Sequence, residues 1–167
     1  MLEAVRDFSD ERLAFKPGPD RWSISESVEH LTIIHNLVLS HVQEVVGSPS
    51  NVKESAWQGR DDELLDHTRS RENSLKVPEI GNPTNQWPPA ELFRQFKDIR
   101  DRMMDFGARA DAPLRSYCFP HPVYGEKDCY QWLCRARGRS CSSRLKASSL
   151  GFAWVSCIFP LFGRGWE

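Results

Sequence analysis

The stretch Arg21–Leu31, RWSISESVEHL, carries the clearest structural signal in the chain. Ser23 is followed three residues later by Glu26, the spacing of a capping box, in which each side chain binds a backbone amide of the first helical turn. Beyond this box, apolar residues recur at spacings of four and three: Ile24, Val28, Leu31, Ile34, Val38, Val42 and Val45. The pattern predicts an amphipathic helix over residues 24–46, which Gly47 ends.

A second helix is predicted over residues 89–110, because proline is favoured in the first turn and an apolar stripe follows it. The stripe consists of Leu92, Phe96, Ile99, Met103, Phe106 and Ala110. Further helical segments are expected at about 1–14 and from 128 onward, with a short surface helix within 61–74. No strand pattern competes with these helices, and the stretch 118–128 reads as a turn-rich connection. The expected fold class is all-α, a helical bundle.

Composition favours one ordinary globular domain. The chain has 167 residues, of which 40% are hydrophobic and 27% charged. The net charge of −1 gives no reason to expect nucleic acid or an anionic membrane as partner. The N-terminus lacks the apolar core of a signal peptide, and the apolar run Phe152–Phe162 is far shorter than the ~20 residues that span a bilayer. We therefore expect a cytoplasmic protein.

The even charge balance hides an unusual tail. Residues 134–167 hold five arginines and Lys146 against Glu167 alone, a charge of +5, so residues 1–133 carry −6. Three of the five cysteines also lie in this tail. Such an abrupt change predicts a boundary near Leu133, with a domain over 1–133 and an unrelated basic tail over 134–167. One hypothesis for the tail is translation in a shifted reading frame, and genuine divergence is the other.

Cysteine and histidine spacing gives no local metal site. No two cysteines stand at C-x-x-C spacing, and no two histidines share a helical face at i,i+3 or i,i+4. The histidines are His30, His35, His41, His67 and His121. His35 and His41 are interpreted as edge or core residues. The closeness of Cys118 to His121 is weak evidence for a catalytic pair, because no third residue is seen to orient the base.

Four segments in order resemble one known family. They are FKPGPDRWSISESVEHL (15–31), LLDHTRSRENSLKVPE (64–79), NQWPPAELFRQFKDIRDRM (85–103) and HPVYGEKDCYQWL (121–133). Together they are similar to the motifs of the DinB-like (YfiT-like) superfamily, over about four fifths of the chain.

The resemblance implies a DinB-like four-helix bundle, here with a short first helix, that binds nickel or zinc through three histidines. His30 matches the ligand from the second helix. The other two would form H-x-x-x-H about two turns after Gln131-Trp132-Leu133, and the ion would activate water or a thiol. Relatives include small-thiol transferases and a maleylpyruvate isomerase, so a hydrolase or small-thiol S-transferase with a small-molecule substrate is expected, with a homodimer left open.

The sequence departs from this pattern where the metal site should close. No histidine follows His121, and residues such as Arg139 and Ser143 occupy the expected offsets. Arginine stays protonated and cannot ligate a metal. We therefore expect an incomplete fourth helix and weak or absent metal binding, with His30 either a surviving ligand or a structural residue. The alternatives are a non-catalytic helical binding module and a protein attached to membranes by its tail, which lacks an amphipathic period.

Overall fold

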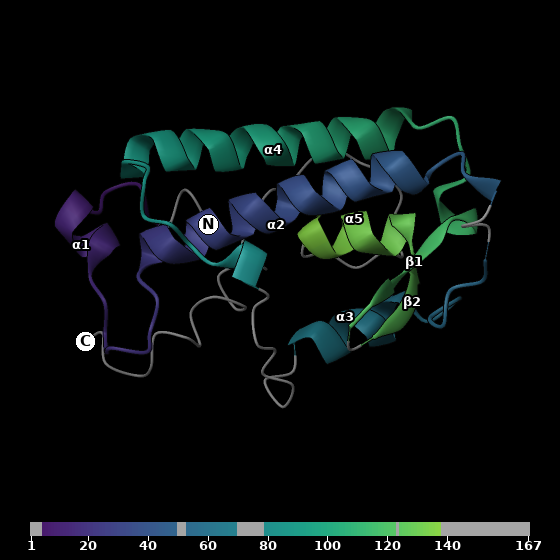
Figure 1. Cartoon of the computed structure of the whole chain (residues 1–167), viewed down its shortest axis with the longest axis horizontal. Helices are drawn as coiled ribbons and strands as arrows, with labels where there is room; N and C mark the ends of the chain where they lie inside the picture. The colour runs from purple at the N-terminus through teal and green to yellow at the C-terminus, as the bar shows by residue number, and fades with distance from the viewer. Residues whose placement is uncertain (1–4, 50–52, 70–78, 123, 138–167) are drawn as a thin grey trace.

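Helices dominate the described part of the chain, as predicted. The computed structural model describes residues 5–49, 53–69, 79–122 and 124–137 (Figure 1). Its elements are α1 (Asp10–Ala14), α2 (Ile24–Val45), α3 (Asp61–Arg69), the 3-10 helix η3 (Glu79–Gly81), α4 (Pro89–Arg109), the 3-10 helix η4 (Leu114–Ser116), β1 (Cys118–His121), β2 (Gly125–Asp128) and α5 (Cys129–Arg137).

The two long helices, α2 and α4, pack side by side and run in the same direction (Figure 1). At their N-terminal ends, Val28 packs with Leu92 and Phe96. At their C-terminal ends a larger cluster also takes in β1, η4 and α5: Leu39, Val42, Val45, Ile99, Met103, Leu114, Phe119, Cys129 and Leu133. Parallel neighbours require a long connection, and residues 46–88 return the chain to the start of α4. This connection includes residues 81–85, which contact the first half of α2.

The face that α2 buries differs from the predicted stripe in its first half. Val28 is buried as expected, but so are polar residues: Glu26, Ser27, Glu29, Thr32 and His35. Thr32 is satisfied locally, since its hydroxyl donates to the carbonyl of Val28 at 2.8 Å. Buried polar side chains need such hydrogen-bond partners. The N-terminal half of α2 therefore differs from its C-terminal half in burying several polar side chains.

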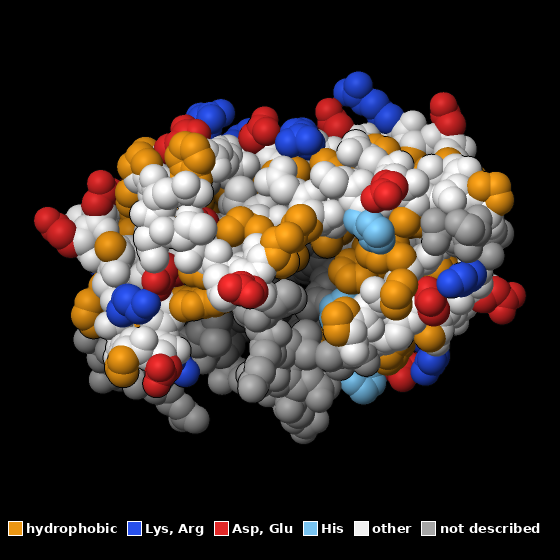
Figure 2. All heavy atoms as spheres, viewed as in Figure 1, with side chains coloured by type: hydrophobic (Ala, Val, Ile, Leu, Met, Phe, Trp, Pro, Cys, Tyr) orange, Lys and Arg blue, Asp and Glu red, His pale blue; other side chains and the backbone are white. Residues whose placement is uncertain are grey.

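The outer face of α4 is charged, with acidic and basic side chains along it in Figure 2. Arg94 pairs with Glu91 at 2.6 Å, and Lys97 pairs with Asp101 at 2.6 Å. Pairs at these spacings are neighbours on a helix surface and add only about 0.2–0.5 kcal/mol each. The opposite face of α4 contains the predicted stripe, of which Leu92, Phe96, Ile99 and Met103 are buried.

The first helix is shorter than the predicted segment 1–14, because it begins only at Asp10. Ser9 caps it, accepting a hydrogen bond from the amide of Arg12 at 3.3 Å. Just before it the chain forms a turn, closed by the amide of Phe8 and the carbonyl of Val5 at 3.1 Å. The apolar spacing in this segment was therefore not enough to extend the helix upstream of its cap.

The prediction of no strands was wrong. β1 and β2 form an antiparallel hairpin in which Cys118 pairs with Asp128 and His121 with Gly125. Each strand has four residues, too few for an alternating pattern to stand out, and Pro120 lies within β1. Gly125 has φ of 66°, a left-handed conformation that suits glycine at the start of β2.

The hairpin also corrects the placement of His121, which is the last residue of β1 and not part of a turn-rich connection. His67 lies in α3, within the stretch 61–74 where a short surface helix was expected. The last helix, α5, begins at Cys129, close to the predicted start at 128. The hypotheses of a reading-frame shift and of a separate tail concern residues that lie almost wholly outside the described ones, so both stay predictions.

Candidate functional site

His30 lies in the second turn of α2, held between an aromatic ring and a backbone carbonyl. Its Nδ1 is 2.8 Å from the carbonyl oxygen of Gly81, at the end of η3. Its ring centroid is 4.9 Å from that of Trp22, in the segment before the helix. A carbonyl oxygen only accepts, so Nδ1 carries the proton and donates. The lone pair of the neutral ring is therefore on Nε2.

The environment of His30 favours the neutral ring. Burial lowers its pKa below the usual 6.5, and this outweighs the opposing effect of the hydrogen bond to Gly81. A metal ligand must be an unprotonated imidazole, and ligating histidines commonly donate their other ring N–H to a carbonyl or carboxylate. His30 thus has the protonation state and the outer partner of a ligand.

The segment that supplies the Gly81 carbonyl is bound to the same helix by Glu29. This carboxylate, 4% exposed, accepts three hydrogen bonds. The amide of Thr84 donates at 2.9 Å and its hydroxyl at 2.6 Å, while the amide of Asn85 donates at 2.9 Å. Sequence reasoning did not single out Glu29, because no local spacing indicates a contact between residues 55 positions apart.

Glu26 forms the predicted capping box and also reaches the same segment. Its Oε2 accepts from the amide of Ser23 at 2.7 Å, and the Ser23 hydroxyl accepts from the Glu26 amide at 3.1 Å. Its Oε1 accepts from Nζ of Lys16 at 2.9 Å and from Nδ2 of Asn85 at 3.2 Å. Burial acts to raise the pKa of Glu26, but these hydrogen bonds outweigh it and lower the pKa.

The other histidines do not join His30. His35 is 3% exposed and stacks on Phe96 with ring centroids 5.6 Å apart, which confirms its interpretation as a core residue. Burial, reinforced by the charges of Arg100 and His30, lowers the pKa of His35 to about 3. His41 is exposed, and its ring meets the edge of Phe119 at 4.5 Å. His35 and His41 are thus structural residues of α2.

The described residues do not complete a metal site. Within this part of the chain, no three His, Cys, Asp or Glu side chains lie close enough together to hold an ion. The two ligands that the resemblance places after Leu133 have no histidine counterpart in the sequence. Their expected positions fall outside the described residues or where side chains are not described. Among the described residues, His30 therefore has no two companions with which to form the three-ligand set that the resemblance implies.

The thiol of Cys118 is not an activated nucleophile. It is fully buried and donates to the carbonyl of Lys53 at 3.1 Å. Burial, with the negative charges of Asp128 and Glu126, raises its pKa to about 11. The ring of His121 packs against Tyr124 and Trp132 with centroids 4.7 and 5.0 Å away. Both residues of this pair are parts of the packing around the hairpin.

A second polar cluster, unforeseen from sequence, joins α3, η4, β2 and α5. Arg115 contacts Asp61 at 2.7 Å and Asp128 at 3.2 Å. Gln131 donates from Nε2 to Asp61 at 2.8 Å and to the carbonyl of Trp57 at 3.1 Å. Its Oε1 accepts from the hydroxyl of Ser55 at 2.6 Å. Each polar atom of the Gln131 side chain is used within the protein, which marks the cluster as structural.

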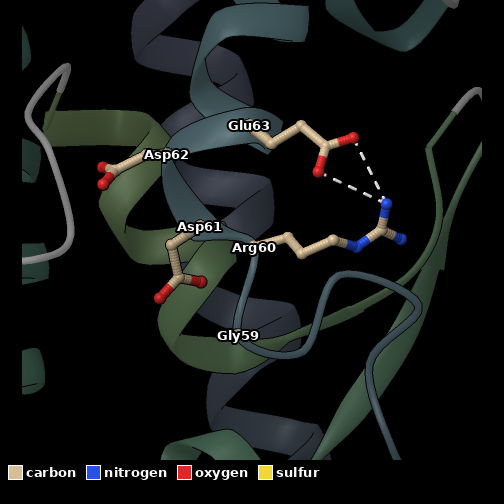
Figure 3. Close-up of a pocket in the computed structure, with 5 residues that line it drawn as sticks. All are labelled: Gly59, Arg60, Asp61, Asp62 and Glu63. Atoms are coloured by element: carbon tan, nitrogen blue, oxygen red, sulfur yellow. Dashed lines mark hydrogen bonds and ion pairs between the residues drawn. The ribbon is translucent and has the colours of Figure 1, made fainter.

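An acidic hollow lies at the start of α3. It encloses about 370 Å³ and is lined by Gly59, Arg60, Asp61, Asp62 and Glu63. Figure 3 shows Arg60 directed toward Glu63, with Asp61 and Asp62 pointing away from this pair. The carboxylate of Asp61 already accepts from Nε2 of Gln131 and pairs with Arg115, and the Arg60–Glu63 ion pair at 3.2 Å is exposed. The hollow is thus a solvated helix start at Asp62 and Glu63, while Asp61 belongs to the cluster of Gln131.

None of the helices among the described residues combines the length and the apolarity that crossing a bilayer requires.

The comparisons with known proteins agree with the motif resemblance. The family model described as DinB superfamily matches residues 1–135. The uncharacterized protein YuaE of Bacillus subtilis (strain 168) is 26% identical over 134 residues, which cover 77% of this chain and 76% of YuaE. No solved structure matches. The family match ends two residues beyond Leu133, and the separate status of residues 134–167 stays a prediction.

Proposed function

Because this chain belongs to the DinB superfamily, we propose that it descends from a metal-dependent hydrolase or small-thiol S-transferase acting on small molecules. In this proposal His30 is the retained ligand for a divalent ion, nickel or zinc, and the site is not completed by the residues after Leu133. The chain then lacks the activity of an intact site.

The observation that supports the ligand role is the 2.8 Å contact between His30 Nδ1 and the Gly81 carbonyl. It puts the lone pair on Nε2 and restricts rotation of the ring. A histidine with a purely structural role could use either nitrogen, whereas a ligand must keep one nitrogen unprotonated.

The proposed loss of tight metal binding follows from the number of ligands. Catalytic sites for such ions use about three protein ligands, and one imidazole alone loses the chelate effect. The described residues supply His30 without two companions. No reaction step is therefore assigned to a bound ion in this chain.

Elemental analysis of the full chain tests the proposal. The protein, purified without an affinity tag and dialysed against a zinc or nickel buffer, should retain well below one ion per chain. The variants His30→Ala and His41→Ala form a matched pair, because both remove an imidazole from α2. Near-stoichiometric metal that is lost with His30→Ala and kept with His41→Ala would show that other residues complete the site.

A non-catalytic binding module is the second candidate, favoured by a hollow of about 410 Å³ between the N-terminal segment and the start of α4. Its lining is mainly apolar: Val5, Leu13, Pro89, Ala90 and Phe93, with Arg6 and Asp10. Hollows of roughly 300–1,000 Å³ are the size that small ligands occupy. The fluorescent probe anilinonaphthalene sulfonate should bind the chain, and Phe93→Ser should weaken it while Phe15→Ser, at an exposed ring outside the hollow, should not.

A further inference from the structure

The first half of α2 holds one short segment of chain, Gly81–Asn85, at both of its ends. At one end, His30 donates to the carbonyl of Gly81 at 2.8 Å. At the other, Glu29 accepts from Thr84 and Asn85 through three hydrogen bonds of 2.6 to 2.9 Å. Because His30 and Glu29 are adjacent in sequence, the two ends of the segment are held by consecutive residues of one helix.

Glu29 makes the larger contribution to this attachment. Its carboxylate is 4% exposed, so water does not replace a partner that is lost. All three of its partners are donors, and a carboxylate can accept from all of them at once. A buried carboxylate deprived of such donors is costly, which keeps the segment in this position.

The conformation of the segment agrees with a fixed attachment. Asn85 has φ of 57°, the left-handed region that most side chains avoid and asparagine tolerates. In this conformation its amide donates to Glu29 and its side chain to Glu26 at 3.2 Å. The amide of Asn82 closes η3 on the carbonyl of Glu79 at 3.0 Å, so Gly81 lies between two ordered points.

We propose that Glu29 is a positioning residue for His30, acting through the Gly81–Asn85 segment. By holding Thr84 and Asn85, Glu29 keeps the Gly81 carbonyl against Nδ1 of His30 and so keeps the ring in the form that exposes a lone pair at Nε2. This inference rests on the proposed function, since that function makes the lone pair of His30 the group that matters.

Nitrogen-15 NMR of the metal-free full chain, at a pH where the imidazoles are neutral, tests the proposal. A neutral imidazole in water carries its proton mostly on Nε2, so a proton on Nδ1 of His30 is a distinctive state. The parent chain should show this state. In Glu29→Gln the side-chain amide places an N–H against a backbone N–H, which should loosen the Gly81–Asn85 segment. The Gly81 carbonyl is then no longer held against Nδ1, so His30 should shift to a mixture containing the Nε2–H form.

Glu44→Gln is the matched control, because it makes the same change on an exposed residue of the same helix. It should leave the His30 signal unchanged. Amide exchange at Thr84 and Asn85 should rise by about tenfold or more in Glu29→Gln alone, as expected for loss of a buried hydrogen bond. An unchanged His30 signal in folded Glu29→Gln would overturn the proposal.

Two further variants keep the test decisive. If Glu29→Gln does not fold, Thr84→Val removes only the hydroxyl donor at 2.6 Å, and it should produce a smaller shift of the same kind. No shift in that variant would overturn the proposal. Asn85→Gly keeps the backbone amide and the positive φ but loses the contact with Glu26, so the His30 signal should persist. A shift as large as that of Glu29→Gln would assign the positioning to Glu26 instead.

The same spectra, recorded again after zinc is added, separate this inference from the proposed function. If Nδ1 of His30 is protonated and depends on Glu29, the positioning role stands even when zinc fails to perturb the ring. If zinc perturbs His30 in the parent and in Glu29→Gln alike, the ligand role stands and the positioning role fails.

Discussion

Asp128 and Gln131 cap each other at the start of α5. The carboxylate of Asp128 accepts from the backbone N–H of Gln131 at 2.6 Å. In return, Oε1 of the Gln131 side chain accepts from the backbone N–H of Asp128 at 3.1 Å. This is the reciprocal arrangement of a capping box, formed by aspartate and glutamine in place of serine and glutamate. The D-x-x-Q spacing is thus a second sequence signal for the start of α5, beside the predicted start at 128.

Gln131→Ala should lower the free energy of unfolding by about 2–4 kcal/mol. The substitution leaves several buried polar groups without their partner, among them the hydroxyl of Ser55 at 2.6 Å. Denaturant unfolding measures the loss. Gln95→Ala is the control, since Gln95 makes one hydrogen bond to Glu91 on the surface of α4. Equal losses in the two variants would contradict the structural role of Gln131.

His35 should make the fold sensitive to mild acid. Its pKa is about 3 in the folded chain, against the usual 6.5. As the pH falls below 6.5, His35 therefore takes up a proton in the unfolded chain but not in the folded chain. The contribution of neutral His35 to the free energy of unfolding, complete above pH 6.5, is lost as the pH falls toward 3, by up to about 1.4 kcal/mol per pH unit. His35→Leu should flatten the dependence between pH 6.5 and 5.5, a range in which ordinary carboxylates stay ionised. Denaturant unfolding at several pH values checks this, and a parallel decline in parent and variant would refute it.

The thiols of Cys118 and Cys129 should resist alkylation in the native chain. Both are fully buried, and burial raises their pKa to about 11 and about 12. The thiolate is the reactive form, so iodoacetamide at pH 8 should leave both unmodified until guanidinium unfolds the protein. Peptide mass spectrometry reports each site separately. Rapid native modification of Cys118 would instead support a reactive role for it.

A replacement fourth helix should restore metal binding. In the graft, the residues after Leu133 are exchanged for a helix that places H-x-x-x-H about two turns beyond Gln131-Trp132-Leu133. Two imidazoles four residues apart share a face, and His30 supplies the third ligand. Zinc should then approach one ion per chain and be lost again with His30→Ala. A graft that folds, as judged by circular dichroism, but binds no zinc would remove the support for His30 as a ligand.

Local sequence patterns predicted the long helices well. The capping box of Ser23 and Glu26 and the stripe of α4 depend on contacts within a few residues, so their spacing is visible in the sequence. The hairpin was missed because four-residue strands leave no alternation to detect. The N-terminal helix was overextended, since its cap at Ser9 was not recognised.

The candidate site was predicted only in part. His30 was identified through the family motif, but Glu29 and the Gly81–Asn85 segment were not. Their contacts join residues more than fifty positions apart, and such pairing depends on the course of the whole connection between α2 and α4. The burial of Glu29 and His35 also contradicts the usual placement of charged and polar side chains, which periodicity alone assigns to the surface.

The buried face of α2 changes character along its length. Its first turns bury Glu26, Glu29 and His35, and its last turns bury Leu39, Val42 and Val45 within the larger core cluster. The polar part of the buried face and the larger apolar part thus lie at opposite ends of one helix. On the proposed function, the apolar end of α2 and its core cluster keep the fold even when the metal site, to which His30 at the polar end would contribute, is incomplete. The fold can then be inherited without the activity.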